Sequence, residues 1–469
     1  MAIRLMPLKG PERGNAVTEQ AKVQEGSMPA HHPMAGHTPW LEGALNAQRD
    51  GRFAEAQAVY QRVLRQEPGH PVATHFLGVL LFQCGQTDAG LALVQSSLAA
   101  APGLSDWHNT LGNMLAQLGR ADEAVAAFMG ALEVDARHAL AWNNLGALLL
   151  EQGNVEGARM ALQNAVAMDP AFRDALQNLG DAHTRAGDAH AAALCYCAEY
   201  VLRPPDLAQR QMLGIAYSQL GRHEEAAQVY EAWLQDEPDH PIATHLLAAC
   251  RSHAAVERAS DAYLQAYFDG FADTFERKLL GSLGYQVPAA LGDVVRKLGV
   301  PPRSLRVLDV GCGTGLCGVE LRPFARWLVG VDLSAKSLDK ARGKAVYDTL
   351  HQAEIVAHLA GSEAAAYDLV VAADTLIYFG GIERLVQGVR HVLAPGGWFI
   401  ASLEVLPADS PSPYAIQPSG RYRHRQDDVQ QVLAAAGLEV QETIALDLRH
   451  ELGRPVPGAL VVSRWPGDG

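Results

Sequence analysis

The most informative stretch of this 469-residue chain reads Leu305-Arg-Val-Leu-Asp-Val-Gly-Cys-Gly-Thr-Gly315. It opens with aliphatic and β-branched side chains, which favour a short buried strand, and three glycines follow at alternate positions. Glycine allows a tight turn and lets the backbone approach a ligand closely. A glycine-rich turn between a strand and the N-terminus of a helix forms a site for negative or polar groups. The stretch therefore predicts a strand–turn–helix unit that binds a ligand.

A second short apolar run, from Trp327 to Val331, ends in Asp332. This acid lies about 20 residues beyond Asp309, as an acidic side chain at the tip of the second strand of a nucleotide-binding unit does. At that tip a carboxylate accepts hydrogen bonds from the hydroxyls of a ribose. We therefore expect the ligand to contain a ribose.

Two kinds of nucleotide site fit this pattern. A dinucleotide-binding loop has the spacing Gly-x-Gly-x-x-Gly, whereas here it is Gly-x-Gly-x-Gly, with Asp309 two residues ahead. A later predicted strand, Tyr367 to Asp374, is followed by a helix end, a turn and a strand over Leu393 to Ser402. In order and spacing these segments resemble the class I S-adenosylmethionine-dependent methyltransferases, over about Tyr263 to Arg464. The resemblance implies an α/β, doubly wound (Rossmann-like) domain of seven strands, the third expected within Gln352 to His358.

The resemblance also implies a cofactor, S-adenosyl-L-methionine, and a role for each matching residue. The loop glycines would wrap its methionine and ribose part. Asp309 would approach the methionine ammonium, Asp332 would bind the ribose hydroxyls, and Glu354 would hold the adenine amino group. The expected cofactor-binding residues are Asp309, Gly311, Cys312, Gly313, Gly315, Asp332, Leu333, Glu354, Ile355, Asp374 and Tyr267.

Two of these positions allow more than one interpretation. Asp374, at the tip of the fourth strand, either lies under the sulfonium or caps the following turn. Tyr267, Phe271 and Phe275 are spaced by four, so they form one stripe of a helix. That stripe either packs into the core or closes over the cofactor.

The catalytic residues are less well marked than the cofactor site. Since the cofactor brings the activated leaving group, the protein mainly positions the nucleophile and excludes water. A general base is needed only where the nucleophile must lose a proton. Tyr378 and His424 are our candidates, with His450 and Glu451 as further possibilities.

The first half of the chain repeats every 34 residues, as its proline, glycine and Leu-Gly positions show. The glycine suits a turn between two helices, where a positive φ is cheap only for glycine, and the proline ends the second helix. The Leu-Gly pair lets a neighbouring helix approach closely. The recurring turn glycines are Gly51, Gly85, Gly119, Gly153, Gly187 and Gly221. The period resembles the tetratricopeptide repeat, over six units from about His37 to His240, and implies an all-α solenoid.

A tetratricopeptide array has a concave groove, and in that family the fifth position of each unit faces it. Four consecutive units carry an amide there, at Asn109, Asn143, Gln177 and Gln211. These side chains could hydrogen-bond an extended protein or peptide partner, or they could simply solvate a helix face. We keep both interpretations open.

Composition excludes several classes of function. The net charge is −14, most of it before Asp261, and an acidic surface repels the phosphates of nucleic acid. No apolar run reaches the ~18–20 residues that cross a membrane. The six cysteines are too few for a disulfide scaffold and have no partners at zinc spacing, so we expect no metal and a cytoplasmic location. The segment Ala373-Asp-Thr-Leu376 replaces the Asn/Asp-Pro-Pro-Tyr element of amino-group methyltransferases, which argues against adenine and glutamine-amide methylation.

We divide the chain into a disordered tail (1–36), six repeats (37–240), a solvating cap helix with a linker (241–262) and a methyltransferase domain (263–469). The expected function is S-adenosylmethionine-dependent methyl transfer, with repeats that recruit a protein or peptide substrate or partner. One alternative is a scaffold whose methyltransferase domain is inactive. Another is a small-molecule methyltransferase that its repeats dock into an assembly.

Overall fold

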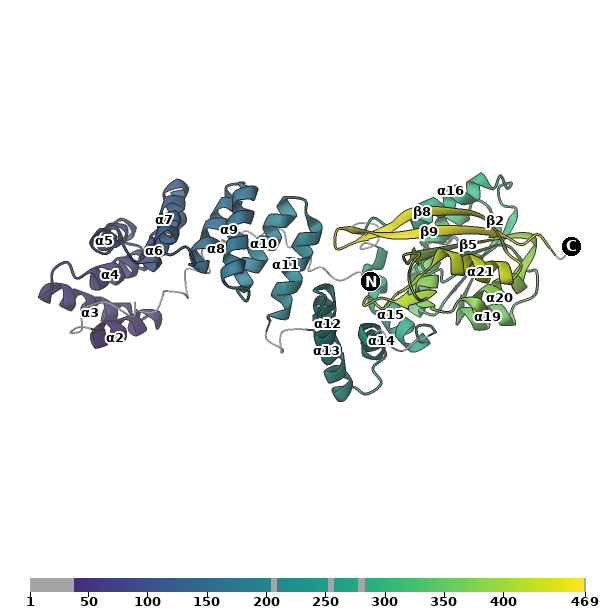
Figure 1. The fold of residues 1–469 in the computed structure, drawn as a ribbon, viewed down its shortest axis with the longest axis horizontal. Coiled ribbons are helices and arrows are strands. Elements are labelled where there is room, and N and C mark those ends of the chain that lie inside the picture. The colour runs from purple at the N-terminus through teal and green to yellow at the C-terminus, as the bar shows by residue number, and fades with distance from the viewer. Residues whose placement is uncertain (1–37, 204–208, 252–256, 277–282, 468–469) are drawn as a thin grey trace. The chain divides into compact units, whose positions relative to one another are not determined.

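The computed structural model describes residues 38–203, 209–251, 257–276 and 283–467 (Figure 1). The expected disordered tail, 1–36, lies outside these residues. The described chain divides into two compact units, and the boundary lies between Leu202 and Arg203. The unit that contains the glycine-rich stretch therefore begins well before the predicted start of the methyltransferase domain.

The first unit consists of five helix pairs. They are α2 (Thr38–Arg49), α3 (Phe53–Gln66), α4 (Pro71–Gln83), α5 (Thr87–Ala100), α6 (Ser105–Gln117), α7 (Ala121–Val134), α8 (Ala139–Glu151), α9 (Val155–Met168), α10 (Arg173–Arg185) and α11 (Ala189–Val201). The sixth pair, α12 (Arg210–Gln219) and α13 (His223–Asp236), belongs to the second unit. The predicted all-α repeats are confirmed, but the compact units do not divide where the repeats end.

The repeated glycines do what their spacing predicts. All six turn glycines have φ between 72° and 83°, a region that side-chain-bearing residues rarely adopt. Within the helices, a Cβ placed on Gly112 would lie 2.5 Å from the ring of Phe128, and one on Gly180 would lie 2.5 Å from the ring of Tyr196. The Leu-Gly and aromatic positions of a unit therefore pack directly on each other.

The prediction that four consecutive amides are accessible to a partner is wrong for Asn109 and Asn143. Asn109 and Asn143 are only 4% and 0% exposed. Asn144 donates to the Oδ1 of Asn109 at 3.0 Å, and Asn178 donates to the Oδ1 of Asn143 at 2.9 Å. These bonds join α6 to α8 and α8 to α10, so the two asparagines hold neighbouring repeats together.

The other two amides remain accessible. Gln177 on α10 is exposed, and Gln211 on α12 is partly exposed. They lie in different compact units. A peptide-binding role for them stays a prediction.

Helix α14 (Pro241–Arg251), which we expected to be a solvating cap, is packed instead against α13 and α15 (Asp261–Glu276). The ring of His245 stacks on the ring of Tyr263, with centroids 3.8 Å apart. The Nε2 of His245 also lies 2.8 Å from the carbonyl oxygen of Gly420. This last helix therefore belongs to the packing of the second unit.

The rest of the second unit is an α/β sheet. Its elements are α16 (Val287–Lys297), β1 (Leu305–Val310), α17 (Leu316–Leu321), β2 (Ala325–Asp332), α18 (Ala335–Gly343), β3 (Thr349–Gln352), α19 (Ile355–Gly361), β4 (Tyr367–Ala372), η2 (Leu376–Tyr378), α20 (Glu383–Val392), β5 (Leu393–Val405), β6 (Tyr414–Ile416), β7 (Tyr422–His424), α21 (Gln426–Ala435), β8 (Glu439–Glu451) and β9 (Arg454–Arg464). Helices cover both faces: Leu308 and Val310 of β1 pack in one cluster with α19, α20 and α21. Val307, on the opposite face of β1, packs in a second cluster with α16 and α17.

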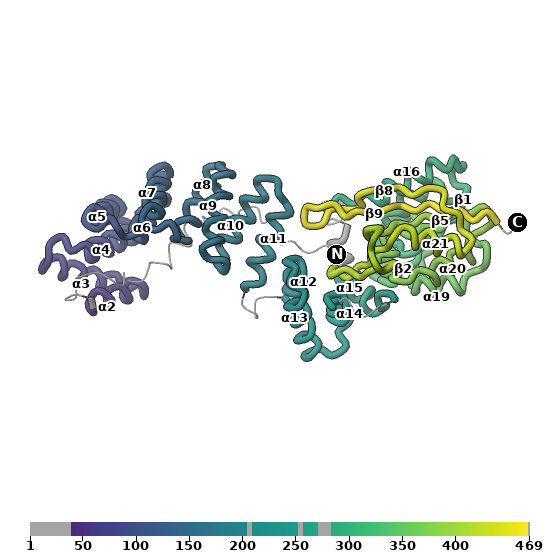
Figure 2. The backbone as a smooth tube through the Cα atoms, viewed as in Figure 1, coloured from purple at the N-terminus to yellow at the C-terminus, as the bar shows by residue number. Residues whose placement is uncertain are grey.

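The sheet contains the expected seven strands and two more. Strands β3, β2, β1, β4 and β5 are parallel neighbours, β9 pairs antiparallel to β5, and β8 pairs with β9. Figure 2 shows β8 and β9 as a long hairpin. The additional strands β6 and β7 form a short hairpin on the end of β5, at Glu404 and Val405.

The third strand lies earlier than predicted. β3 spans Thr349–Gln352, and the segment expected to be this strand instead begins helix α19 at Ile355. β3 has only four residues at an edge of the sheet, and none of them is fully buried, so it carries no apolar run. Glu354 accepts hydrogen bonds from the backbone N–H groups of Val356 and Ala357, which starts the helix.

Candidate active site

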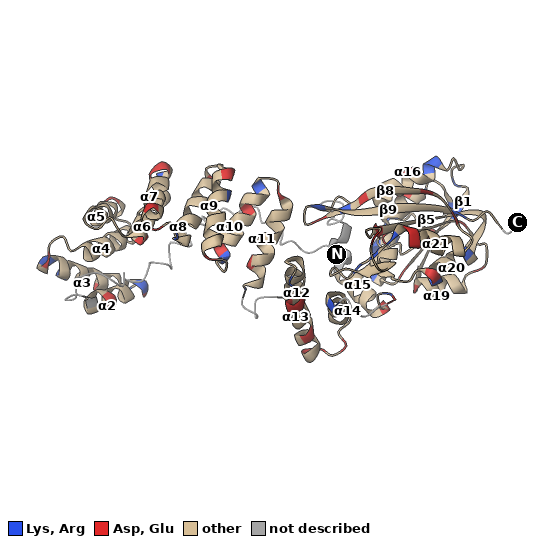
Figure 3. Ribbon diagram, viewed as in Figure 1, with Lys and Arg blue, Asp and Glu red and all other residues tan. Residues whose placement is uncertain are grey.

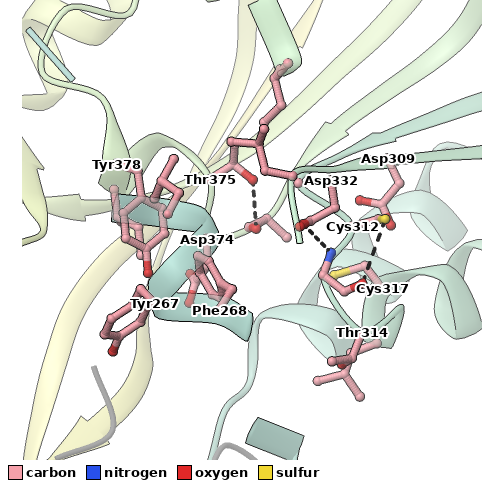
Figure 4. A pocket seen from close by; sticks show the side chains of 18 of the residues that line it. Tyr267, Phe268, Asp309, Cys312, Thr314, Cys317, Asp332, Asp374, Thr375 and Tyr378 are labelled. Atoms are coloured by element: carbon pink, nitrogen blue, oxygen red, sulfur yellow. Dashed lines mark hydrogen bonds between the residues drawn. The ribbon is translucent and has the colours of Figure 1, made fainter. Parts of the chain in front are cut away.

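A cleft lies at the carboxyl ends of β1, β2 and β4, where an open parallel sheet binds its ligands (Figure 4). Side chains from α15 and η2 complete its walls. The predicted site residues that line it are Asp309, Gly311, Cys312, Gly313, Asp332, Leu333, Glu354, Ile355, Asp374, Tyr267 and Tyr378. The tertiary structure thus gathers residues from segments that are far apart in the sequence.

The glycine turn has the backbone that only glycine adopts easily. Gly311, Gly313 and Gly315 have φ of 74°, 53° and 88°. A Cβ on Gly311 would lie 2.3 Å from the Oγ1 of Thr375, so β1 and the end of β4 approach closely here. Gly315 does not line the cleft: it precedes α17, and a Cβ there would lie 3.0 Å from the ring of Tyr347.

Asp332 is tied to the glycine turn. Its Oδ2 accepts from the N–H of Gly313 at 2.9 Å, and its Oδ1 accepts from the N–H of Ser334 at 2.8 Å. Burial raises its pKa, and these backbone hydrogen bonds oppose that rise. Each carboxylate oxygen has a second lone pair, so the group can also accept from two hydroxyls in the cleft.

Asp309 has one oxygen in use and one without a partner. Its Oδ2 accepts from the hydroxyl of Tyr347 at 2.7 Å. Its Oδ1 is buried and has no hydrogen-bond partner among the described residues. Burial, the largest cause, raises the pKa of Asp309 to about 7. A cationic donor such as an ammonium in the cleft would satisfy this oxygen, so the residues present fit the amino acid part of the expected cofactor.

Tyr347 supports the site from outside the cleft lining, and it was not predicted from the sequence. Its hydroxyl holds Asp309, and its ring fills the space above Gly315 and Gly318. It lies between α18 and β3, outside every motif used for the prediction. Only the folded chain shows that glycine and ring fit together.

Glu354 lines the cleft from an unexpected element. Besides capping α19, its Oε1 accepts from the Nη1 of Arg258 at 2.8 Å. Arg258 also lines the cleft and was not predicted. The Glu354 carboxylate therefore already has hydrogen-bond partners within the protein.

Asp374 occupies a strained position at the tip of β4. Its φ is 49°, which is uncommon for a residue with a side chain. Its N–H donates to the Oγ of Ser402 at 2.7 Å, and its Oδ2 lies 3.2 Å from the Nη1 of Arg449. Burial raises its pKa, and Arg449 opposes that rise. The side chain itself accepts from the Oγ of Ser402 at 3.2 Å and pairs with Arg449, and η2 has no side-chain cap, so the capping interpretation is wrong.

Arg449 belongs to a buried ion network on the wall of the cleft. Its Nε donates to Glu451 at 2.8 Å, and it also pairs with Glu404. The Nε of Arg421 donates to Glu404 at 2.8 Å, and its Nη2 pairs with Glu451. Arg421, Arg449 and Glu404 are 1–2% exposed.

The ion network gives Glu451 a different role from the predicted one. We expected Glu451 as a possible base, but its carboxylate is engaged by two guanidinium groups. Burial works against its ionisation, yet Arg421 and Arg449 lower its pKa overall. Arg421 and Arg449 are far apart in the chain, and nothing in the sequence indicated that both would pair with the same two acids.

Of the two candidate bases, one lines the cleft and the other does not. Tyr378 lines the cleft, and burial raises its pKa well above the usual value, so its hydroxyl stays protonated at neutral pH. His424 does not line this cleft. Because β7 pairs with the end of β5, its Nε2 lies 3.2 Å from the carbonyl oxygen of Gly380, beside a separate pocket. The expectation that His424 acts in the cleft is therefore wrong.

Tyr267 packs into the core, and its closing over the cofactor stays a prediction. It is 5% exposed, packs with Tyr263 and Leu264, and also lines the cleft. The side chains of Phe271 and Phe275 lie outside the described residues.

In the part of the chain that the structure describes, no helix is both long and apolar enough to span a membrane. Within those same residues, no group of three or more His, Cys, Asp or Glu side chains is arranged to hold a metal ion.

Models of known families match segments in both halves of the chain. A model described as a methyltransferase domain matches residues 308–399, which carry the glycine turn and the strands around the cleft. Models described as tetratricopeptide repeats match residues 47–114, 109–165, 148–207 and 207–250.

Curated relatives match part of the second half. A ubiquinone biosynthesis O-methyltransferase from Leptothrix cholodnii is 31% identical over 102 residues, 21% of this chain and 43% of the relative. A tRNA 5-carboxymethoxyuridine methyltransferase from Escherichia coli is 28% identical over 140 residues, 28% of this chain and 53% of the relative. The chain thus spans about half the length of these two relatives.

Among solved structures, magnesium protoporphyrin IX methyltransferase from Synechocystis PCC 6803 matches with a TM-score of 0.35 and 19% identity. That match covers 44% of this chain and 98% of the solved one. The family models thus find tetratricopeptide repeats followed by a methyltransferase domain in this chain.

Proposed function

We propose that this protein is an S-adenosylmethionine-dependent methyltransferase whose repeats bind a protein or peptide. The observation that carries the proposal is the glycine turn after β1, beside a buried carboxylate oxygen of Asp309 that has no partner among the described residues. The cleft thus offers a close backbone approach, an acceptor for an ammonium, and a second acid, Asp332, for hydroxyls.

The residues divide the work of binding. Asp332 accepts hydrogen bonds from the ribose hydroxyls, while Leu333 and Ile355 supply apolar surface for the adenine ring. Asp309 pairs with the methionine ammonium. When bound, S-adenosyl-L-methionine supplies an activated methyl group on its sulfonium.

The remaining residues prepare the acceptor side. Tyr267, Phe268 and Tyr378 form an aromatic wall that excludes water from the cleft. Arg449 keeps the Asp374 carboxylate in place, so a fixed negative charge faces the region where a positive centre would bind. Tyr378 donates a hydrogen bond to the acceptor because its raised pKa keeps it protonated.

The repeats are proposed to recruit the substrate or a partner. Acidic side chains are prominent in the first turns of α7 and α13 (Figure 3). With Asn109 and Asn143 used between repeats, the exposed Gln177 and the partly exposed Gln211 are the amides left for a peptide. The alternatives remain a scaffold with an inactive domain, or a small-molecule methyltransferase that its repeats dock into an assembly.

The names of the relatives point to different reactions, an O-methylation in ubiquinone biosynthesis and the methylation of tRNA 5-carboxymethoxyuridine. These reactions belong to those proteins. The intact glycine turn and Asp332 favour an active enzyme over a scaffold, because both features serve the cofactor and neither is needed to dock a partner.

The proposal is tested on the full chain with S-adenosylhomocysteine and with methyl-labelled S-adenosylmethionine. We expect calorimetry to show binding of S-adenosylhomocysteine, and label to pass to a component of a lysate of the source organism. Asp332→Ala serves as the cofactor-blocked control, which should transfer no label. Binding without any transfer would favour the scaffold, and absence of binding by the folded protein would overturn the proposal.

A further inference from the structure

One nitrogen of Arg421 is buried without a partner. Arg421 lies just before β7 and lines the cleft, and it is 2% exposed. Its Nε pairs with Glu404 and its Nη2 pairs with Glu451. Its Nη1 has no hydrogen-bond partner among the described residues. A buried guanidinium nitrogen has two N–H groups and is costly to leave unsatisfied, so this position calls for an acceptor.

The two acids that pair with Arg421 also pair with another arginine. Glu404 and Glu451 each also pair with Arg449, so neither acid belongs to Arg421 alone. Arg423 also lies 3.4 Å from Glu404. Burial is the largest cause that lowers the pKa of Arg421, to about 10, and the neighbouring arginines add to this effect. The guanidinium therefore shares both of its acids with other arginines, and its Nη1 keeps an unused donor.

The cleft that Arg421 helps to line is largely apolar and aromatic. Leu283, Tyr285, Tyr267 and Phe268 line it together with Arg421. Such walls suit a flat apolar body, and one charged contact would orient it.

We propose that the methyl acceptor is an organic acid whose carboxylate binds the Nη1 of Arg421 and whose apolar body packs against the aromatic wall. The inference rests on the proposed methyltransferase function and names the class of its substrate. A monoanion is favoured over a dianionic phosphate, because the carboxylates of Glu404, Glu451 and Asp374 lie in the same network and repel a second negative charge.

The test uses phenylacetate and its uncharged isostere phenylacetamide as probes on the full chain, with and without saturating S-adenosylhomocysteine. We expect phenylacetate to bind about tenfold more tightly than phenylacetamide, since a charge-assisted hydrogen bond is about twice as strong as a neutral one. Phenyl phosphate should bind more weakly than phenylacetate. Ligand-observed NMR titration gives all three affinities.

Two variants locate the effect. Arg421→Gln should bind S-adenosylhomocysteine as the wild type does and should lose the preference for phenylacetate. Arg423→Gln is the matched control: it also neighbours Glu404 but does not line the cleft, so it should keep the preference. If Arg421→Gln fails to fold, the comparison of the three probes on the wild type still decides.

Several results would overturn the inference. These are equal binding of phenylacetate and phenylacetamide, no binding of either at millimolar concentration, tighter binding of phenyl phosphate, or a preference that survives in Arg421→Gln. Failure to bind S-adenosylhomocysteine would instead overturn the proposed function, while the probe titrations without it would still report on Arg421.

Discussion

The protonation of single residues in the cleft depends on the free-energy cost of burying a charge. Asp309 illustrates this, because its ordinary pKa of about 3.9 rises to about 7 when the side chain is buried. The folded state therefore favours the neutral acid. The contribution of Asp309 to the free energy of unfolding is fully present below pH ~4. It is lost as the pH rises through ~7, because ionising this side chain costs more in the folded chain than in the unfolded one.

The titration of Asp309 predicts how cofactor affinity depends on pH. Only the ionised carboxylate pairs strongly with an ammonium, so S-adenosylhomocysteine should bind more tightly as the pH rises from 6 to 8. Calorimetry across this range should show the change, and Asp309→Asn should bind with little pH dependence. An equal slope in the variant would assign the titration to another group.

A second residue-scale prediction concerns Asp332. Asp332→Ala should weaken S-adenosylhomocysteine binding by roughly 2–4 kcal/mol, because two hydrogen bonds to a charged acceptor are lost with some compensation by water. The exposed Asp339, on α18, is the control, and Asp339→Ala should leave the affinity unchanged. An unaltered dissociation constant for Asp332→Ala would mean that the ribose does not bind at the tip of β2.

At the scale of elements, the repeats depend on two kinds of glycine. Turn glycines such as Gly119 have open space around their Cα but a positive φ. Helix glycines such as Gly112 have ordinary helical backbone but no space, because Phe128 lies against them. Glycine is thus needed for its backbone conformation in the turns and for its small size within the helices.

This difference can be measured by rescue. Gly112→Ala should destabilise the repeats by about 1–3 kcal/mol through overpacking, and Phe128→Leu in the same chain should recover part of the loss. Gly119→Ala should cost about 1 kcal/mol through strain, and Phe128→Leu should not relieve it. Urea unfolding followed by circular dichroism gives the three comparisons. Equal rescue of both variants would show that the two mechanisms are not distinct.

The whole molecule divides at Arg203, within the repeats. The second unit includes α14, whose His245 stacks on Tyr263 and contacts the carbonyl of Gly420, next to Arg421. Ile242 of α14 packs with the cluster that contains Tyr267. The end of the repeat array is therefore part of the support of the cleft.

We expect the fragment 203–469 to fold and to bind S-adenosylhomocysteine with the affinity of the full chain. The shorter fragment 255–469, which contains the domain predicted from sequence (263–469), lacks α14 and exposes Tyr263 and the Gly420 carbonyl. It should therefore melt at a lower temperature. Differential scanning calorimetry and titration of both fragments test this, and equal stability would show that the α14 contacts contribute nothing.

Local patterns were enough to predict much of this protein. The 34-residue period, the turn glycines and the strand–turn–helix after Leu305 depend on contacts between residues that are close in the chain, so the sequence carries them directly. The glycine turn and Asp332 were predicted for the same reason, because both belong to one βαβ unit. The short edge strand β3 was misplaced because its four residues carry no apolar run.

The acceptor side of the cleft depends on contacts that no local pattern encodes. Arg449 meets Asp374 across 75 positions of the chain, and Tyr347 reaches Asp309 across 38. Whether an arginine in a strand faces solvent or a buried acid depends on which strand lies beside it, and packing of the whole sheet sets that neighbour. The same holds for Asn109 and Asn143, which the sequence presents as groove residues and the stacking of repeats buries. Short-range periodicity therefore specifies the elements, while the partners of buried polar groups are chosen only when the elements pack.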